Sequence, residues 1–129
     1  MTQSHVAAIA GLEKLCFSDP WSESSIATEL SCRLSCWLVA MEGETLVGYV
    51  GSQTVIDESD MMNIAVHPDF RRRGIAEALV AGLEEQLRQR GSKALTLEVR
   101  DSNAPAIALY EKLGFMTVRE LSRWYDISK

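Results

Sequence analysis

The sequence predicts a single α/β domain in which helices cover a mixed β-sheet. Two segments with helical apolar stripes come first, three strand-like segments follow, and the second half alternates helix and strand. With 129 residues, of which 47% are hydrophobic, the chain can bury the core of one domain of ordinary size. No segment has the composition of a linker or a low-complexity stretch, and no segment is repeated, so we expect one domain over residues 1–129.

The first half predicts two helices and a hairpin. Apolar residues at helical spacing predict a first helix over about residues 2–15, and Ser22 is suited to cap a second helix. Residues 37–41 and 46–54 are rich in strand formers, and Glu42-Gly43-Glu44 between them predicts a hairpin turn.

The centre of the chain predicts a strand that leads into a long helix. We expect residues 57–60 to form a polar loop and residues 61–66 an apolar strand. Pro68 should end that strand, because proline has no amide to donate to a sheet. Apolar residues then recur at helical spacing from Gly74 to about residue 90, and Gly91 favours a helix end.

The last third predicts a strand, a helix and a final strand. Residues 95–99 form the first of these, and Asp101-Ser102-Asn103 can cap a helix that ends at Gly114. Residues 115–118 begin the final strand.

The turn before the long helix has the chemistry of an anion site. It carries three consecutive arginines, and a helix N-terminus adds unpaired amides and the positive end of the macrodipole. Small residues at Gly74 and Ala76 allow a phosphate or pyrophosphate to approach the backbone. On this chemistry alone, an ordinary strand–helix turn with solvated arginines is an equal alternative.

The spacing Arg71-x-x-Gly74-x-Ala76 resembles the acyl-coenzyme A loop of the GCN5-related N-acetyltransferases. A dinucleotide loop would need three glycines and a following acidic residue, and a Walker loop would need Gly-Lys-Ser or Gly-Lys-Thr. Residues 97–115 look like the second signature block of the same family. Together with Asn63-Ile64-Ala65-Val66-His67-Pro68 and Phe17-x-x-Pro20-Trp21-Ser22, they resemble the RimI-type branch, the bacterial ribosomal-protein-alanine N-acetyltransferases. The resemblance covers about residues 6–125.

Two titratable residues are candidates for catalysing the transfer of an acyl group from a thioester to an amine. Glu98 lies near the end of an otherwise apolar strand, so it faces either a cleft or solvent at a sheet edge. Tyr110 can protonate a departing thiolate, because a phenol pKa of about 10 exceeds a thiol pKa of about 8.5. Packing against Leu109 and Leu113 is its structural alternative, and Asn103 is either a plain N-cap or a cofactor contact.

The resemblance implies both a fold and a set of site residues. The fold is a mixed, mostly antiparallel sheet flanked by helices, with central strands that splay apart to form the acetyl-coenzyme A cleft. Glu98 would be the general base and Tyr110 the general acid. The Val66 amide would donate to the thioester oxygen, and no metal is expected. The cofactor-binding residues would be Ile64, Ala65 and Val66 along a strand edge, Arg71, Arg72, Arg73, Gly74, Ile75, Ala76 and Glu77 in the loop, and Asn103 near the pantetheine arm.

The resemblance also implies an acceptor. Acetyl-coenzyme A would donate its acetyl group to the α-amine of a protein N-terminus, an alanine of a small-subunit ribosomal protein, by direct attack in a ternary complex. A small-molecule amine, a lysine side chain or a non-catalytic coenzyme A-binding role are the alternatives. We expect Trp21, Trp124 and Tyr125 on loops beside the acceptor, with Trp124-Tyr125 in place of the family's Tyr-Tyr pair. The first and last strands of the family are expected to be missing or truncated.

The composition restricts the class of partner that the protein can bind and the compartment in which it works. The net charge of −5 and the pI of about 5.0 disfavour nucleic acid and would attract a cationic partner such as a basic polypeptide tail. Three cysteines without a second metal-ligating pair suit reduced thiols. Since no segment reads as a membrane span or a secretory signal, we expect a cytoplasmic protein, and the sequence leaves the oligomeric state open.

Overall fold

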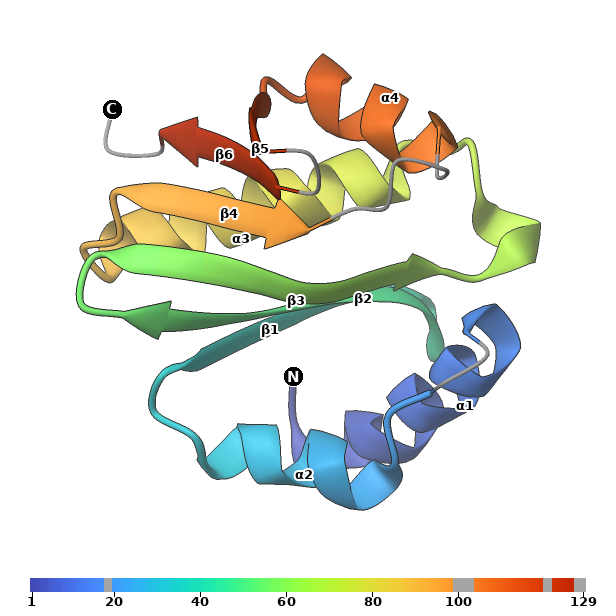
Figure 1. Cartoon of the computed structure of the whole chain (residues 1–129). Helices are drawn as coiled ribbons and strands as arrows, with labels where there is room; N and C mark the ends of the chain where they lie inside the picture. The colour runs from blue at the N-terminus through green and yellow to red at the C-terminus, as the bar shows by residue number, and fades with distance from the viewer. Residues whose placement is uncertain (18–19, 99–103, 120–121, 127–129) are drawn as a thin grey trace.

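The computed structural model describes residues 1–17, 20–98, 104–119 and 122–126, and within them six strands form one sheet with helices on both faces (Figure 1). The strand order is β1-β2-β3-β4-β6-β5. The elements are the 3-10 turns Gln3–His5 and Pro68–Phe70, the helices α1 Val6–Cys16, α2 Glu23–Ser31, α3 Ile75–Gln89 and α4 Ala104–Lys112, and the strands β1 Ser35–Glu42, β2 Thr45–Val55, β3 Glu58–Val66, β4 Ala94–Glu98, β5 Met116–Arg119 and β6 Ser122–Asp126.

Most local predictions from the sequence are confirmed. Ser22 caps α2, because its hydroxyl accepts a hydrogen bond from the Ser25 amide at 3.1 Å. Gly43, in the β1–β2 turn, has φ +60°, and Gly91, just after α3, has φ +88°. Both are left-handed conformations that glycine adopts without a steric cost. Each predicted helix lies within a few residues of its expected bounds.

The predicted polar loop over residues 57–60 is wrong, because β3 already begins at Glu58. Ser59 is 1% exposed, and its hydroxyl lies 2.7 Å from the hydroxyls of both Thr54 and Ser92. These contacts satisfy a polar residue inside a strand, and periodicity alone does not reveal them.

The C-terminal part of the sheet also differs from the prediction. A second strand, β6, follows β5 and lies between β4 and β5, pairing with both. Trp124 and Tyr125 belong to β6, opposite Thr96 and Leu95 of β4, so their predicted place on a loop is wrong. This end of the sheet therefore holds two strands, where the sequence predicted one. Before α1 the structure has the Gln3–His5 turn rather than a strand.

The two central strands part, as the fold class predicted. The parallel β3–β4 pairing joins Glu58, Ser59 and Asp60 to Ala94, Leu95 and Thr96. Beyond that point β3 continues along β2, whereas β4 continues along β6. A bulge helps to turn β3 away, because Gly51 pairs with Asn63 and Ser52 with Met61, which leaves Met62 without a partner in β2.

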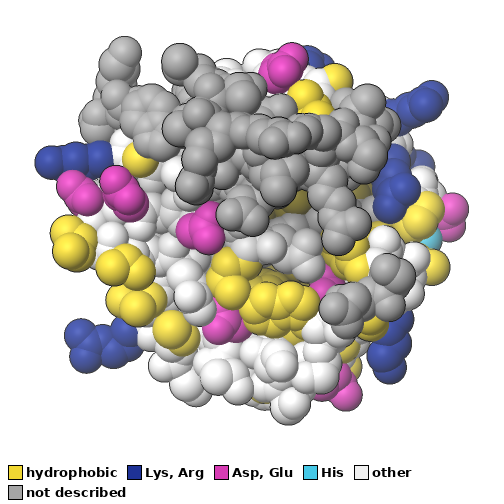
Figure 2. Space-filling view, in the orientation of Figure 1, with side chains coloured by type: hydrophobic (Ala, Val, Ile, Leu, Met, Phe, Trp, Pro, Cys, Tyr) yellow, Lys and Arg dark blue, Asp and Glu magenta, His cyan; other side chains and the backbone are white. Residues whose placement is uncertain are grey.

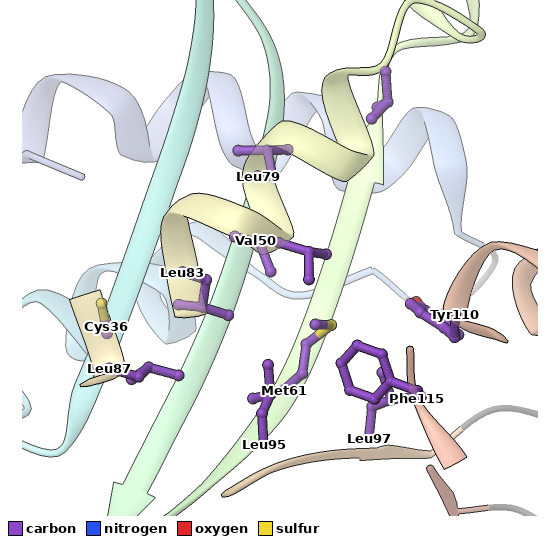
Figure 3. Close-up of a cluster of buried hydrophobic side chains, with 12 residues drawn as sticks. Cys36, Val50, Met61, Leu79, Leu83, Leu87, Leu95, Leu97, Tyr110 and Phe115 are labelled. Atoms are coloured by element: carbon purple, nitrogen blue, oxygen red, sulfur yellow. The ribbon is translucent and has the colours of Figure 1, made fainter. Parts of the chain in front are cut away.

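Two hydrophobic layers hold the sheet between the helices. The buried face of α3 presents Leu79, Val80, Leu83 and Leu87 to one side of the sheet, where they pack with Val50 and Leu95 (Figure 3). The other side packs on α1 and α2. Tyr49 and Val50 are both fully buried but belong to opposite layers, because neighbouring strand residues point to opposite faces. No helix in the described ranges is long and apolar enough to cross a membrane.

Gly51 provides a test of this packing. A Cβ at Gly51 would lie 2.4 Å from Cε2 of the buried Trp37 indole, so we expect Gly51→Ala to lower the free energy of unfolding by about 1–3 kcal/mol. Gly11 is the matched control, because it is exposed in α1 with nothing within 4 Å of an added Cβ. Gly11→Ala should raise stability by about 0.5–1 kcal/mol. Urea unfolding measures both; equal stability of the two variants would contradict the prediction.

Candidate active site

The end of β3 presents backbone groups to the gap between β3 and β4. The His67 amide donates to the Val47 carbonyl at 2.8 Å, so this side of the backbone faces β2. Because amides alternate along a strand, those of Ile64 and Val66 point the other way, into the gap, where the Ile64 amide donates to Asn63 Oδ1 at 3.2 Å. Among the described residues β4 pairs with β3 only as far as Asp60, so it does not cover these amides. An extended ligand can therefore bind along this edge.

Arg71 braces the end of β3. Its Nε donates to the Val66 carbonyl at 3.1 Å, and its Nη2 lies 3.6 Å from Cys16 Sγ. The same thiol lies 3.8 Å from the Val66 carbonyl. The sequence placed Arg71 among the cofactor-binding residues, whereas its described contacts are with the protein. Its guanidinium links the loop to the strand end and to α1.

The loop before α3 has the backbone geometry of an anion site. Arg72 has φ +65° and Gly74 has φ +78°, and successive unusual backbone conformations of this kind form a concave nest of amides. The first turn of α3 leaves the amides of Ile75, Ala76 and Glu77 without intrahelical partners, and no side chain in the described part of the chain caps them. Nothing lies within 4 Å of a Cβ built at Gly74. The loop therefore has open amides where a pyrophosphate would bind.

Two charged side chains of this region already have partners. Arg73 lies 3.5 Å from the Glu42 carboxylate, and its guanidinium is 4.9 Å from the centre of the Phe70 ring. Glu77 accepts a hydrogen bond from Lys112 at 3.0 Å, which joins α3 to α4. Exposed ion pairs of this kind contribute little stability, so these side chains can rearrange around a ligand.

Tyr110 is positioned by α4 and is 7% exposed. Its ring meets the edge of Phe115 at a centroid distance of 5.8 Å. Figure 3 shows the ring projecting from α4 toward the sheet, with its oxygen at the far end. Burial raises the pKa of the Tyr110 phenol above its usual value, so it stays protonated at neutral pH. A neutral phenol in this position can donate a proton.

For three other predicted site residues the structure describes only the backbone, and a fourth lies outside the described part of the chain. Glu98 ends β4 opposite Ser122, on the strand that borders the gap, but its side chain is not described. The side chains of Trp124 and Tyr125 are likewise not described. Asn103 lies outside the described residues.

Trp21 lies at the edge of an open hollow of about 430 Å³, lined among the described residues by Pro20, Trp21, Ser22 and Ser25. Its indole meets the Trp37 ring edge-on at 5.7 Å. The hollow lies where α2 begins, on the α1–α2 side of the sheet.

The sequence reasoning missed Glu13, a carboxylate that is 1% exposed beside this hollow. Its Oε1 accepts from the Trp21 amide at 2.9 Å, and its Oε2 accepts from the Tyr49 hydroxyl and from Asn63 Nδ2. Burial, and then the hydrogen bond to Glu13, raise the pKa of Tyr49, so its phenol remains the donor. A signal existed in the sequence, because Glu13 follows Ile9 by four residues and so shares its buried helix face.

Comparison with known proteins identifies the family of this chain. The model of the acetyltransferase (GNAT) family matches residues 6–115. The chain belongs to the GNAT family. Over 104 residues it is 41% identical to the ribosomal protein bS18-alanine N-acetyltransferase of Escherichia coli K12, a match that covers 81% of this chain and 70% of the other.

Solved structures agree with this assignment. The crystal structure of the ribosomal-protein-S18-alanine N-acetyltransferase from Escherichia coli aligns with a TM-score of 0.89 and 33% identity, over 100% of this chain and 92% of the other. The PaiA N-acetyltransferase of Thermoplasma acidophilum, solved with coenzyme A, shares the fold with a TM-score of 0.86 at 14% identity, over 98% and 95% of the two chains.

The chain is thus an acetyl-coenzyme A-dependent acetyltransferase of GNAT fold. The structure fits this cofactor on its own evidence, because β4 does not pair with the edge of β3 at Ile64 and Val66, and the amides at the start of α3 lie open. No group of three or more His, Cys, Asp or Glu side chains that could hold a metal occurs within the described residues.

We expect Gly74→Asp to abolish acetyl-coenzyme A binding, because a carboxylate would meet the pyrophosphate where the backbone approaches it most closely. Gly91→Asp is the matched control, since Gly91 also has positive φ and open space but lies beyond the far end of α3. Calorimetry should show saturable binding for the wild type and the control, and no heat for Gly74→Asp. Equal affinity of a folded Gly74→Asp variant would show that this loop does not bind the cofactor.

Proposed function

We propose that this enzyme acetylates the α-amino group of the N-terminal alanine of a small-subunit ribosomal protein. The observation that carries the proposal is the 41% identity to an enzyme named for this reaction on bS18. The structural likeness to an enzyme named for the same acceptor extends over the whole chain, which supports a shared acceptor site as well as a shared cofactor site. An enzyme that acts on ribosomal proteins would work in the cytoplasm.

The reaction is direct transfer within a ternary complex, and each protein group has one task in it. The amides of Ile64 and Val66 bind the pantetheine arm and the thioester oxygen, while the backbone of residues 72–77 binds the pyrophosphate. Asn103 contacts the cofactor beside them. This arrangement holds the thioester carbon in the gap between β3 and β4, where the amine can reach it.

Proton transfer completes the reaction. Glu98 removes a proton from the acceptor ammonium, and the free amine attacks the thioester carbon to form a C–N bond. The negative charge develops on the thioester oxygen beside the Val66 amide. When the C–S bond breaks, Tyr110 gives its proton to the departing thiolate; its raised pKa keeps it protonated until then. The nitrogen, which carries one proton more than the amide product, then loses that proton to the Tyr110 phenolate.

The acceptor enters from the side of α1 and α2. Trp21 lines the hollow there, and Trp124 and Tyr125 contribute from β6. Figure 2 shows acidic side chains beside a hydrophobic patch near the middle of the view, with Lys and Arg side chains toward the rim. With a net charge of −5, this surface suits a cationic N-terminus followed by basic residues.

We expect Glu98→Gln to lower turnover on the order of a hundredfold while the affinity for acetyl-coenzyme A stays nearly unchanged. Raising the pH should restore part of the rate, because an α-amine with a pKa of about 7.7–8.0 then deprotonates by itself. The protonated Tyr110 phenol should not limit this rescue below a pH of about 10, because burial raises its pKa. Glu111→Gln, exposed on α4, is the matched control and should keep full activity. Full activity of Glu98→Gln at neutral pH would show that Glu98 only faces solvent.

We expect a peptide that begins Ala-Arg to be acetylated faster than the same peptide with a blocked α-amine and free lysines. The preference for basic downstream residues should weaken as salt rises, because exposed charges are screened within about 10 Å at 0.1 M. Initial rates on a panel of peptides, free lysine and a polyamine measure both effects. If lysine or the polyamine is acetylated faster than every N-terminal peptide, the proposed acceptor is wrong, although the enzyme is still an acetyltransferase.

A further inference from the structure

We infer that Glu13 is a positioning residue that sets the acceptor loop at Trp21 against the cofactor strand β3. This inference rests on the proposed function, because it assigns a role at the acceptor side of the same site. The acceptor loop is the segment between α1 and α2 that carries Trp21. Glu13 itself lies in α1, and one of its carboxylate oxygens accepts a hydrogen bond from this loop while the other accepts one from β3.

One oxygen holds the acceptor loop. Glu13 Oε1 accepts from the Trp21 amide at 2.9 Å, directly at the hollow that Trp21 lines. The indole of Trp21 in turn meets Trp37, which stacks on Tyr49 at 5.7 Å with an interplanar angle of 11°. A shift of the Trp21 backbone would therefore move the indole that borders the acceptor hollow.

The other oxygen holds the cofactor strand. Glu13 Oε2 accepts from Asn63 Nδ2 at 2.7 Å and from the Tyr49 hydroxyl. The Asn63 side chain then accepts, through Oδ1, from the Ile64 amide at 3.2 Å. Asn63 lies at the bulge where β3 turns away from β4, so this chain of bonds reaches the strand edge proposed to bind the pantetheine arm.

Only a carboxylate matches this set of partners. Glu13 receives three donors, and an ionised carboxylate accepts on both oxygens and donates on neither. A glutamine would have one oxygen and one NH2 group. In one orientation its NH2 would face the Asn63 NH2, and in the other it would face the Trp21 amide. Within the described part of the chain no cation pairs with this buried charge, so the three donors alone compensate it.

The chain offers a matched control in Glu29, a second buried carboxylate, on α2. It is 8% exposed, and its oxygens accept from the side chains of Ser35, Trp37 and Gln53. These partners lie on β1 and β2, and one of them, Trp37, contacts the Trp21 indole. Within the described residues Glu29 accepts no hydrogen bond from the Trp21 amide or from Asn63, so Glu29→Gln reproduces the loss of a buried charge without removing a hydrogen bond of the proposed coupling.

The chain also allows a swap that keeps the links from position 13 to the Trp21 amide and, through position 63, to the Ile64 amide. In the double variant Glu13→Gln with Asn63→Asp, the new amide at position 13 accepts from the Trp21 amide through its oxygen. Its NH2 group donates to the new carboxylate at position 63, which also accepts from the Ile64 amide. The net charge is unchanged, and the Tyr49 oxygen can accept from the second hydrogen of the new NH2 group, in place of the bond that it donates to Glu13.

The experiment measures KM for the acceptor, kcat, and coenzyme A affinity by calorimetry for the wild type and the three variants. The acceptor is the one that the wild type acetylates fastest in the panel described above. Glu13→Gln should raise the acceptor KM at least tenfold, with coenzyme A affinity within about twofold, because the hydrogen bonds of Glu13 do not reach the loop at 72–77. Glu29→Gln should leave KM within about twofold, and the swap should bring KM back to within about threefold of the wild type.

The outcomes separate this inference from the proposed function. A wild type that prefers a polyamine overturns the proposed acceptor, yet the Glu13 comparison still holds for that amine. The inference is overturned if Glu13→Gln keeps the acceptor KM, if Glu29→Gln raises it equally, or if the folded swap shows the raised KM of the single variant. If Glu13→Gln does not fold, a folded swap with the wild-type KM supports the inference, and a swap that also fails to fold overturns it. A wild type that acetylates no amine overturns both proposals.

Discussion

The parting of β3 and β4 is the constraint on which the rest of this structure depends. Two parallel strands that stayed paired would satisfy each other's amides along their whole length, and no site would exist. Here the strands pair at three positions, and then each follows a different antiparallel neighbour. The Val66 amide is therefore left for a ligand, beside an Ile64 amide that donates only to the Asn63 side chain, at the point where α3 also presents its unpaired first turn.

Opening a sheet in its middle requires firm support on both faces. Hydrophobic packing supplies most of it, from α3 on one side and α1 with α2 on the other. Polar anchors then define the geometry more narrowly than packing does, since a hydrogen bond specifies an angle as well as a distance. The Ser59 hydroxyl fastens the closed end of the β3–β4 pair, Arg71 braces the open end, and Glu13 ties β3 to the loop at Trp21.

The two sides of the site are built differently. The proposed cofactor side consists mainly of backbone groups from a strand edge and a helix N-terminus, which suits a ligand shared by a whole family. The proposed acceptor side depends on side chains, with Trp21 at a hollow and its amide bonded to a buried carboxylate. Relatives can therefore keep one donor and change the acceptor, which is why the fold shows the reaction type whereas the acceptor remains a proposal.

The sequence by itself determined most of the local elements, and it predicted a cofactor loop. Helical periodicity predicted α3, Ser22 and Gly91 marked helix ends, and the arginine–glycine spacing predicted the anion site. Only the tertiary structure decided which strands pair, so β6 between β4 and β5 and the start of β3 at Glu58 were not predicted. The same holds for Glu13, whose partners lie 8, 36 and 50 residues away. Propensity and spacing act over a few neighbours, whereas strand pairing and buried hydrogen bonds join distant residues that meet only when the chain folds.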